Sequence, residues 1–409
     1  MSSRWLSASL RSLVSYIGKG IIPKYVESEQ CGSMVVLGQR CVRNQTVDYG
    51  QARLHDGAAK HVKNEKLVQQ GDILINATGV GSAGRVAQVV EQPGQLCTTD
   101  GHVITLRASE GIDPYYLGYF LKSKQALIEQ MAEGSTGQTE MNRNRLQDEI
   151  IVTYPEDPSF QRAIASIGLN LDSRVAINSR LNDYLFECCA AKMNDIVGVP
   201  SSTIKVDDCC ELIYSGGTPS TKNPAYWNGD LPWLSSGETR SRFIIDTEKT
   251  ITELGVMESS TKLAKTGDIV MASAGQGFTR GQTSMLFFDT YVNQSVVVMR
   301  PKKDYGAYLL LMLAGQYDNL RAWSDSTSTR GSMSGKLLKQ FELPYFDANQ
   351  AKELTEFAAP MFRMIENNMR ESKVLAQARD VLLPKLMSGE IDLAKIEFPT
   401  QPNNHLCAG

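Results

Sequence analysis

Gly71-Asp72-Ile73-Leu74 returns 196 residues later in the chain as Gly267-Asp268-Ile269-Val270. The glycines that follow, Gly79 and Gly81, return at the same offset as Gly275 and Gly277. A match at a fixed spacing is the signature of an internal repeat, which constrains the architecture more firmly than local propensity does. The sequence therefore predicts two similar halves.

The match extends in both directions from this motif. Residues 14–18 align with residues 212–216 at an offset of 198, and Leu106-Arg107 aligns with Met299-Arg300 at an offset of 193. A few short loop deletions explain the drift in offset. Within each half, short β-rich runs alternate with Gly-rich turns and precede a helix, so each half is predicted to be an α+β domain.

A long stretch with helical spacing of apolar residues follows each half. The first seam consists of Ile164, Ile167, Leu171, Arg174, Asn178, Leu181, Leu185 and Cys188, and the second of Leu354, Phe357, Met361, Met364, Asn368, Glu371, Leu375 and Ala378. A sustained three-four spacing is typical of a coiled coil, in which an asparagine fixes the register. We expect two long helices that pair antiparallel as a coiled coil; the alternative is that each packs on its own domain.

These patterns divide the chain as follows. The two domains are predicted at residues 1–157 and 198–345, the helices at 158–197 and 346–388, and a C-terminal tail at 389–409. The length of 409 residues fits two to three domains.

The composition is that of an ordinary globular protein, with 42% hydrophobic and 21% charged residues. The apolar runs are shorter than the roughly 18–20 residues that cross a bilayer, and serines interrupt the first twenty positions, so neither a membrane span nor a secretory signal is expected. We expect a cytoplasmic protein. The eight cysteines form no CxxC pair, which favours reduced thiols over a zinc site or disulfides.

The parts needed for catalysis are missing from the sequence. The segment before Gly335-Lys336 lacks the glycine of a phosphate loop, and Leu337 stands where its hydroxyl residue would be. The histidines are scattered: His55, His61, His102 and His405. No segment resembles the Asn-Pro-Pro-Tyr of enzymes that methylate an extruded adenine. We expect no catalytic residues, no metal and no cofactor.

Both halves instead carry Gly-rich loops with side chains that suit phosphates and base edges. Although the net charge is −3, residues 36–66 contain six basic and three acidic residues. A solvated surface is the alternative reading of that segment. The candidate contact residues are Gln39, Arg40, Arg43, Asn44, Arg85, Ser135, Thr136, Gln138, Arg143, Ser235, Ser236, Glu238, Arg240, Gln276, Arg280, Thr327, Thr329, Arg330 and Lys336.

Several of these segments together resemble the specificity subunits of type I restriction-modification enzymes. The first half carries the resemblance at residues 24–27, 37–44 and 71–79. The second half carries it in Gly216-Gly217-Thr218-Pro219, Tyr226-Trp227, Pro232-Trp233 and Asn293-Gln294, and the tail of the last helix in residues 378–389. The first half departs from the second, because it has Gly18-Lys19-Gly20 where the second has Gly-Gly-Thr-Pro.

The resemblance implies two target-recognition domains that each read one part of a split site in double-stranded DNA. It also implies a helical spacer that sets the gap, two docked methyltransferase subunits, and restriction/translocase subunits that join the complex. Because the halves differ in their loops, we expect them to read different sequences. Two other functions compete: an enzyme fused to its recognition module, and an adaptor or structural protein that binds other proteins through paired domains.

Overall fold

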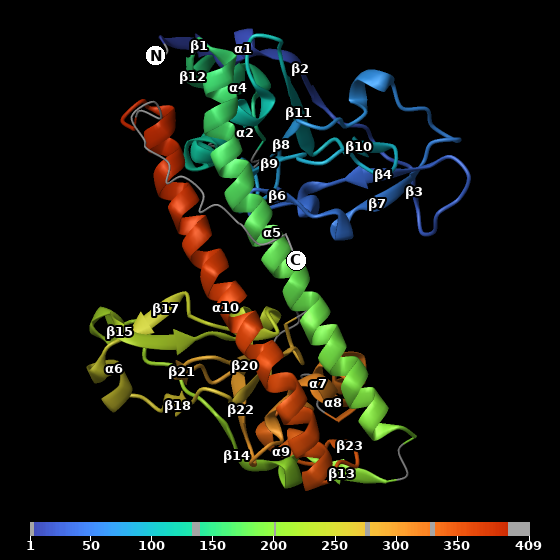
Figure 1. Ribbon diagram of the computed structural model, residues 1–409, viewed down its shortest axis with the longest axis vertical. Coiled ribbons are helices and arrows are strands. Elements are labelled where there is room, and N and C mark those ends of the chain that lie inside the picture. The colour runs from blue at the N-terminus through green and yellow to red at the C-terminus, as the bar shows by residue number, and fades with distance from the viewer. Residues whose placement is uncertain (1–3, 133–139, 200–201, 275–278, 328–331, 392–409) are drawn as a thin grey trace, which may run out of the picture. The chain divides into compact units, whose positions relative to one another are not determined.

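A computed structural model describes residues 4–132, 140–199, 202–274, 279–327 and 332–391 (Figure 1). The contacts divide the chain into unit 1, Met1–Ser173 with Leu375–Gly409, and unit 2, Arg174–Val374. Each unit thus combines one half of the sequence repeat with segments of both long helices, α5 (Pro158–Val197) and α10 (Ala348–Met387). The division into two domains, two helices and a tail that the sequence predicts stays a prediction.

Before α5 begins, strands outnumber helices among the described elements of unit 1. Its strands are β1 (Trp5–Ser9), β2 (Val14–Lys19), β3 (Tyr25–Val26), β4 (Ser33–Leu37), β5 (Val42–Arg43), β6 (Thr46–Val47), β7 (Arg53–Asp56), β8 (Ile73–Asn76), β9 (Val86–Gln88), β10 (Cys97–Thr99), β11 (Val103–Ala108) and β12 (Ile151–Pro155). Its shorter helices are α1 (Leu10–Leu13), α2 (Pro114–Ser123), α3 (Gln125–Ala132) and α4 (Arg143–Glu149).

Unit 2 repeats this order between α5 and α10. Its strands are β13 (Thr203–Lys205), β14 (Cys210–Ser215), β15 (Trp227–Leu234), β16 (Phe243–Ile244), β17 (Lys249–Ile251), β18 (Lys262–Ala264), β19 (Ile269–Ala272), β20 (Thr283–Leu286), β21 (Thr290–Val292), β22 (Val296–Pro301) and β23 (Glu342–Pro344). Its shorter helices are α6 (Glu253–Met257), α7 (Gly306–Gly315), α8 (Tyr317–Thr327) and α9 (Gly335–Leu338).

The main sheets of the two units have equivalent topologies. The strand order is β2-β11-β8-β9 in unit 1 and β14-β22-β19-β20-β16 in unit 2. In both, the central strand pairs antiparallel with its two neighbours. A second sheet lies in each unit, ordered β10-β4-β7-β3 and β17-β15-β21-β18. The repeat and the α+β class predicted from the sequence are confirmed.

The repeated Gly-Asp motif forms the turn that starts the central strand. Gly71 has a φ of 88° and Gly267 a φ of 87°, which glycine adopts without steric cost. The next residue, Asp72, accepts two bonds from the Arg107 guanidinium, from Nε at 2.8 Å and from Nη2 at 2.7 Å. Asp268 pairs with Arg300 in the same way, at 3.0 and 2.8 Å. Both aspartate side chains are almost fully buried.

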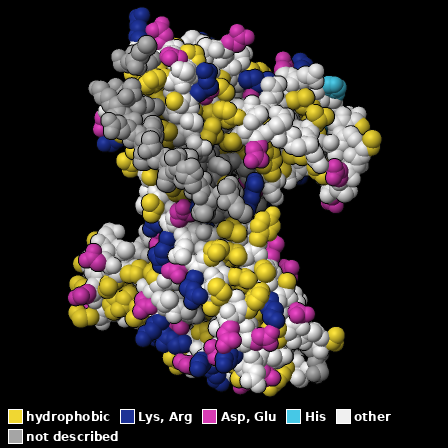
Figure 2. Space-filling view, viewed as in Figure 1, with side chains coloured by type: hydrophobic (Ala, Val, Ile, Leu, Met, Phe, Trp, Pro, Cys, Tyr) yellow, Lys and Arg dark blue, Asp and Glu magenta, His cyan; other side chains and the backbone are white. Residues whose placement is uncertain are grey.

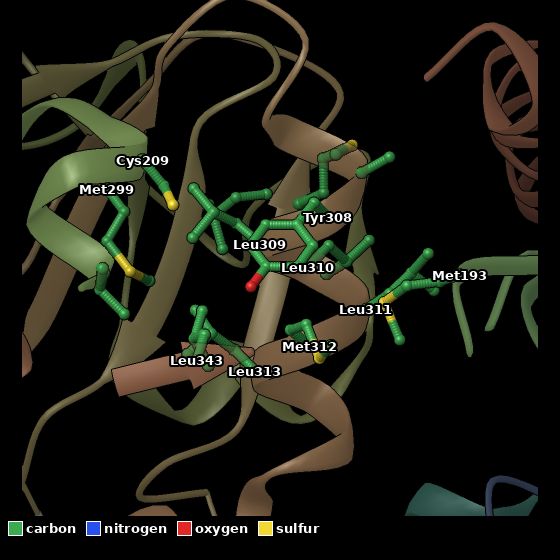
Figure 3. Close-up of a cluster of buried hydrophobic side chains, with 14 of the residues drawn as sticks. Met193, Cys209, Met299, Tyr308, Leu309, Leu310, Leu311, Met312, Leu313 and Leu343 are labelled. Carbon is green, nitrogen blue, oxygen red and sulfur yellow. The ribbon is translucent and has the colours of Figure 1, made fainter. Parts of the chain in front are cut away.

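Helices cover the central sheets and complete the cores. Asp113 caps α2 by accepting bonds from the Tyr115 and Tyr116 amides, and Pro114 occupies the first helical position. In unit 2, α7 is buried from Ala307 to Leu313. Figure 3 shows its side chains packed with those of Cys209, Met299 and Leu343. The Tyr308 ring stacks on Phe346 with the ring centroids 4.4 Å apart.

Within unit 2, α5 and α10 run antiparallel. Asn178 donates to a Glu371 carboxylate oxygen at 2.7 Å, and Lys192 pairs with Glu353 at 2.7 Å, so rising numbers on α5 meet falling numbers on α10. Asn368 donates to Asn182 at 2.9 Å and its carbonyl accepts from Asn178 at 3.3 Å. The two matching asparagines therefore lie in one polar cluster. Knobs-into-holes packing of a coiled coil stays a prediction.

Within unit 1, a buried polar cluster joins α2 to both long helices. Arg379 donates to Asp172 at 2.5 Å, and the Tyr119 hydroxyl donates to the other Asp172 oxygen at 2.7 Å. Lys122 lies 3.8 Å from the same carboxylate with its side chain 4% exposed, and burial lowers its pKa to about 8. Gly168 of α5 makes room for the Tyr119 ring, because a Cβ there would come within 2.6 Å of it.

The described residues contain no helix with the length and apolar character that a membrane crossing requires. The cysteines at positions 31, 41, 97, 188, 189, 209 and 210 are free thiols. Burial raises the pKa of the Cys41 thiol to about 11.

Replacing Asp72 with Asn should destabilise unit 1. The change removes the charge that balances the Arg107 guanidinium, whose side chain is 23% exposed. We expect a loss of about 2–4 kcal/mol in the free energy of unfolding, because a broken pair leaves a charge partly buried. Urea unfolding followed by circular dichroism measures it. Glu149→Gln, at an exposed ion pair with Arg145, is the control and should cost less than about 1 kcal/mol. Equal losses would contradict the structural role of Asp72.

Candidate nucleic-acid interface

Three loops of unit 1 meet at one edge of its main sheet. Strand β8 ends at Asn76 and its antiparallel neighbour β11 begins at Val103, so loops 77–85 and 100–102 leave the sheet at the same edge. The chain returns to this edge after residues 133–139, where the Met141 amide donates to the Ala77 carbonyl at 2.7 Å. Thr78 also forms an antiparallel bridge with Glu140.

Unit 2 joins its equivalent loops with the same bonds. The Met333 amide donates to the Ser273 carbonyl at 2.7 Å, and the Ser273 amide donates to the Ser295 carbonyl at 2.8 Å. Ser273, which directly follows β19, therefore contacts both the turn before β22 and the segment before α9. In each unit, the described ends of the loops next to the central strand lie at one edge of the main sheet.

Thr78 is the centre of a polar network in unit 1. Its Oγ1 accepts a hydrogen bond from Gln39 Nε2 and lies 2.9 Å from His102 Nδ1. The Gln39 carbonyl in turn accepts from the Asn76 side chain at 3.2 Å. Gly79 follows with a φ of 106°, and a Cβ there would come within 2.8 Å of the Gln39 side chain. This network attaches the segment around Gln39 to loop 77–85.

A tight hairpin next to Gln39 presents exposed basic and amide side chains. Its strands are β5 and β6, joined by Asn44 and Gln45 with φ values of 48° and 61°. Two consecutive residues with positive φ are typical of a type I′ turn, which rigidly connects antiparallel strands. Arg43 and Asn44 are exposed at its tip, and the Arg43 carbonyl accepts from Thr46 Oγ1 at 3.1 Å.

The side chains of several predicted contact residues form hydrogen bonds within the protein. Gln39 belongs to the Thr78 network. Arg85 donates to the Gly81 carbonyl of its own loop at 2.7 Å. Ser235 and Glu238 form a capping box, and the second Glu238 oxygen accepts from the Glu248 amide at 2.8 Å. These side chains position loops, and direct contact with bases is a poorer assignment for them.

Arg280 is the clearest case of such a side chain. It is only 6% exposed and pairs with Asp325 of α8 at 2.7 Å. This ion pair attaches the chain before β20 to α8, and the guanidinium is almost entirely shielded from solvent. The sequence predicted a surface contact for Arg280.

The remaining predicted residues are exposed or lie outside the described residues. Arg40, Arg43, Asn44, Arg143 and Lys336 are exposed, and none of the arginines among them forms an ion pair with a described residue. Arg240 is exposed and pairs with Glu248 at 3.3 Å, and Ser236 is half-buried. The predictions that fall outside the described residues are Ser135, Thr136, Gln138, Gln276, Thr329 and Arg330; for Thr327, at the end of α8, only the backbone is described.

The basic segment of unit 1 is only partly available to a ligand. Lys66 donates to the carbonyls of Lys19 and Gly20 at 3.2 and 2.8 Å, and Lys60 donates to the Ile22 carbonyl at 2.8 Å. Arg53 stacks on the Tyr25 ring. On the face drawn in Figure 2, Lys and Arg side chains lie among Asp and Glu side chains and form no continuous basic surface.

Acidic groups adjoin the loop cluster of unit 1. The hydrogen bond and charge of Lys19 lower the pKa of Glu140, which keeps that carboxylate ionised. Asp100 is buried below the Gln39 segment, and burial raises the pKa of its carboxyl group. Its Oδ1 accepts from the His102 amide at 2.9 Å. Both carboxylates hold loops in place.

A cavity of about 830 Å³ lies in unit 2 between α5, α10 and the segment around β16. Its lining contains two ion pairs, Arg242 with Asp183 at 3.0 Å and Lys373 with Asp246. A phosphate site needs unneutralised positive charge, so these paired groups do not form one. Among the described residues, no three His, Cys, Asp or Glu side chains are grouped as metal ligands.

Sequence reasoning missed Thr78 and His102. Thr78 lies inside the repeated motif and aligns with Ala274 of the second half. This difference between the halves could have marked Thr78 as a residue with a role specific to unit 1. His102 is one of the four scattered histidines, which the sequence does not assign to any site. No local pattern links it to Thr78, which is 24 residues away in the chain.

The sequence matches the profile of the type I restriction modification DNA specificity domain twice, over residues 3–185 and 199–372. It is 26% identical over 200 residues to the type I restriction enzyme MjaIX specificity subunit of Methanocaldococcus jannaschii, covering 45% of this chain and 43% of that protein. It is 26% identical over 162 residues to the EcoR124I/EcoR124II specificity subunit of Escherichia coli, covering 39% and 40%. The chain thus spans about two fifths of the length of these relatives.

The fold is similar to that of the S subunit of the type I restriction-modification system from M. genitalium. The TM-score is 0.55 with 16% sequence identity, over 94% of this chain and 96% of that one. At this identity the likeness concerns the fold, and it covers both units.

Replacing Thr78 with Val should loosen loop 77–85 without unfolding unit 1. The variant keeps the side-chain shape but removes the hydroxyl that joins Gln39 to His102. The amides of Ser82 and Ala83, which donate to the Gly79 carbonyl, should exchange with solvent about fivefold faster, the factor for one hydrogen bond of about 1 kcal/mol. Hydrogen exchange measured by NMR or mass spectrometry tests this. Thr46→Val, in the neighbouring hairpin, should leave these amides unchanged; equal acceleration would refute the assigned role.

Proposed function

The chain belongs to the type I restriction modification DNA specificity family, and on this basis we propose that it is the non-catalytic subunit that reads the DNA target of a type I restriction-modification complex. The observation that carries the proposal is the duplicated loop cluster. Each of the two family matches covers a sheet at one edge of which the described ends of several candidate loops are hydrogen-bonded to one another. Two such clusters suit a bipartite site in double-stranded DNA.

The proposal assigns a role to each segment of the chain. Residues 1–157 and 198–345 are the target-recognition domains, residues 158–197 and 346–388 are the spacer helices, and residues 389–409 form the tail. The recurrence of the Asp-Arg pair in both halves supports two domains of one kind. Their loops differ in sequence, so each domain reads its own half-site.

In the first domain, the β5–β6 hairpin is the proposed reading element. Arg43 suits the O6 and N7 atoms of guanine, and Asn44 suits adenine. The backbone of a type I′ hairpin is already fixed, so binding through it costs the rotamer freedom of the side chains but little backbone freedom. Arg40 and Arg143 are proposed phosphate contacts in this domain. In the second domain, Lys336 and Arg240 take that role.

The exposure of each remaining predicted contact residue decides the role that we propose for it. Gln39, Arg85, Ser235, Glu238 and Arg280 position the loops. Ser236 is assigned to the contact surface, as are residues beyond the described ranges: Ser135, Thr136, Gln138, Gln276, Thr327, Thr329 and Arg330. No cofactor and no metal are part of the proposed function.

The proposed partners are two methyltransferase subunits and the restriction/translocase subunits. The relatives of this chain are named specificity subunits of type I restriction enzymes, which supports partners of this class. The spacer helices expose apolar residues such as Ile177 and Tyr184 on α5 and Val381 on α10, which a partner could cover. A complex that acts on DNA belongs in the cytoplasm.

An adaptor or structural protein is the second candidate, and an enzyme with a fused recognition module the third. Neither explains an exposed Arg-Asn hairpin on a rigid turn. Methyl transfer to adenine-containing DNA decides between them, measured for the purified chain alone and with its methyltransferase partner. We expect no transfer, cleavage or ATP hydrolysis by the chain alone, and sequence-dependent transfer by the complex. Turnover by the pure chain would contradict the non-catalytic role.

Replacing Arg43 with Ala should relax the preference at one base position of the first half-site. Loss of two hydrogen bonds to guanine costs about 1–3 kcal/mol at that position. Binding of the complex to a library randomised in both half-sites, at two salt concentrations, measures the effect.

Lys63→Ala is the matched control, because Lys63 is an exposed cation of the same segment that lies outside the predicted set. It should leave the base preference intact. For Arg43→Ala, an even loss over all sequences with a salt slope smaller by about one would indicate a phosphate contact instead. A relaxed preference confined to the second half-site would refute the assignment.

A further inference from the structure

The tip of loop 77–85 carries an aliphatic side chain in open solvent. Val80 is 93% exposed and stands between Gly79 and Gly81, whose φ values are 106° and 70°. Among the described residues, and apart from the two chain neighbours, no atom lies within 4 Å of the position that a Cβ of Gly81 would take. The backbone on both sides of Val80 therefore adopts conformations that lift this one side chain away from the protein.

The loop beneath Val80 is held by hydrogen bonds on both sides of the tip. The Gly79 carbonyl accepts from the Ser82 and Ala83 amides at 3.0 and 2.9 Å, and the Gly84 amide donates to the Asn76 carbonyl at 2.8 Å. Ala83 and Gly84 are buried, and a Cβ on Gly84 would come within 2.5 Å of the Glu129 backbone. The exposure of Val80 thus belongs to a defined loop structure.

A single exposed aliphatic residue is ordinary on a protein surface, and Ile22 and Leu96 of unit 1 are 79% and 63% exposed. Val80 differs from them by its place, two residues after Thr78 and within the loop cluster proposed to face DNA. The fold does not require an aliphatic residue here, because the repeat has Gln at position 276. The side chain at this position is free to serve recognition.

We propose that Val80 is a specificity-determining residue that contacts the C5-methyl group of a thymine in the major groove of the first half-site. An aliphatic side chain cannot hydrogen-bond a base edge, and the thymine methyl is the apolar group that the major groove presents. The contact moves both apolar groups out of water. The inference rests on the proposed function, since it needs unit 1 to read DNA.

A double-mutant cycle between protein and DNA tests the contact. The full chain with its methyltransferase subunits is bound to the target duplex with thymine or deoxyuridine at each thymine of the first half-site in turn. Deoxyuridine lacks only the methyl group. At one position, the wild-type complex should bind the thymine duplex about fourfold more tightly, the factor for one methyl-sized group worth about 0.8 kcal/mol. With Val80→Ala, this ratio should fall close to one.

Leu96→Ala is the matched control, because Leu96 precedes β10 whereas loop 100–102 follows it, so the two lie at opposite ends of that strand. This variant should keep the fourfold ratio. The inference is overturned if Val80→Ala keeps the wild-type ratio of affinities for the thymine and deoxyuridine duplexes at every position. It is also overturned if Val80→Ala weakens binding to both duplexes equally. If the wild-type complex shows no preference for any DNA sequence, the proposed function itself fails, and that outcome is distinct from both.

Discussion

The buried bridge between an aspartate and an arginine is the constraint on which each unit depends. Asp72 stands directly before β8 and Arg107 lies near the end of β11, opposite each other across two antiparallel strands. The bridge fixes the register of these strands, and a slip by one residue would turn every side chain of β8 to the wrong face. At the far end of the same strands, the register determines where loops 77–85 and 100–102 emerge. The bridge thus positions the loops from the opposite end of the sheet.

The same scaffold carries different chemistry in the two units. Asp268 and Arg300 reproduce the bridge, and the Met333 amide reproduces the bond that Met141 makes to the loop after the central strand. The residues that hold the loops differ between the units. Thr78 organises loop 77–85 through side-chain hydrogen bonds, whereas in unit 2 the buried Arg280 guanidinium pairs with Asp325 of α8. The two units share their sheet topology, but different residues hold their loops. Substitutions can therefore change the loop contacts of one unit without changing those of the other.

The sequence predicted the repeat, the α+β class and the long helices, because these depend on patterns that recur along the chain. It also selected loops rich in glycine, arginine and amide residues as candidate DNA contacts, and that assignment stays a prediction. It could not separate exposed side chains from internal ones. Gln39 and Arg43 lie four residues apart, yet one bonds Thr78 and the other faces solvent. That difference depends on a partner 39 residues away, which no local pattern records.

The charge of the chain is the reason why the proposed recognition of DNA assigns sequence preference to a few side chains. Its net charge is −3, and in the basic segment of unit 1 Lys60 and Lys66 donate to carbonyls of their own unit. Nonspecific attraction to DNA grows with the number of phosphates neutralised, so this chain gains little from it. In the proposed function, sequence preference arises instead from contacts of the β5–β6 hairpin to base edges. The proposed methyltransferase subunits would then add affinity by holding the DNA together with this chain.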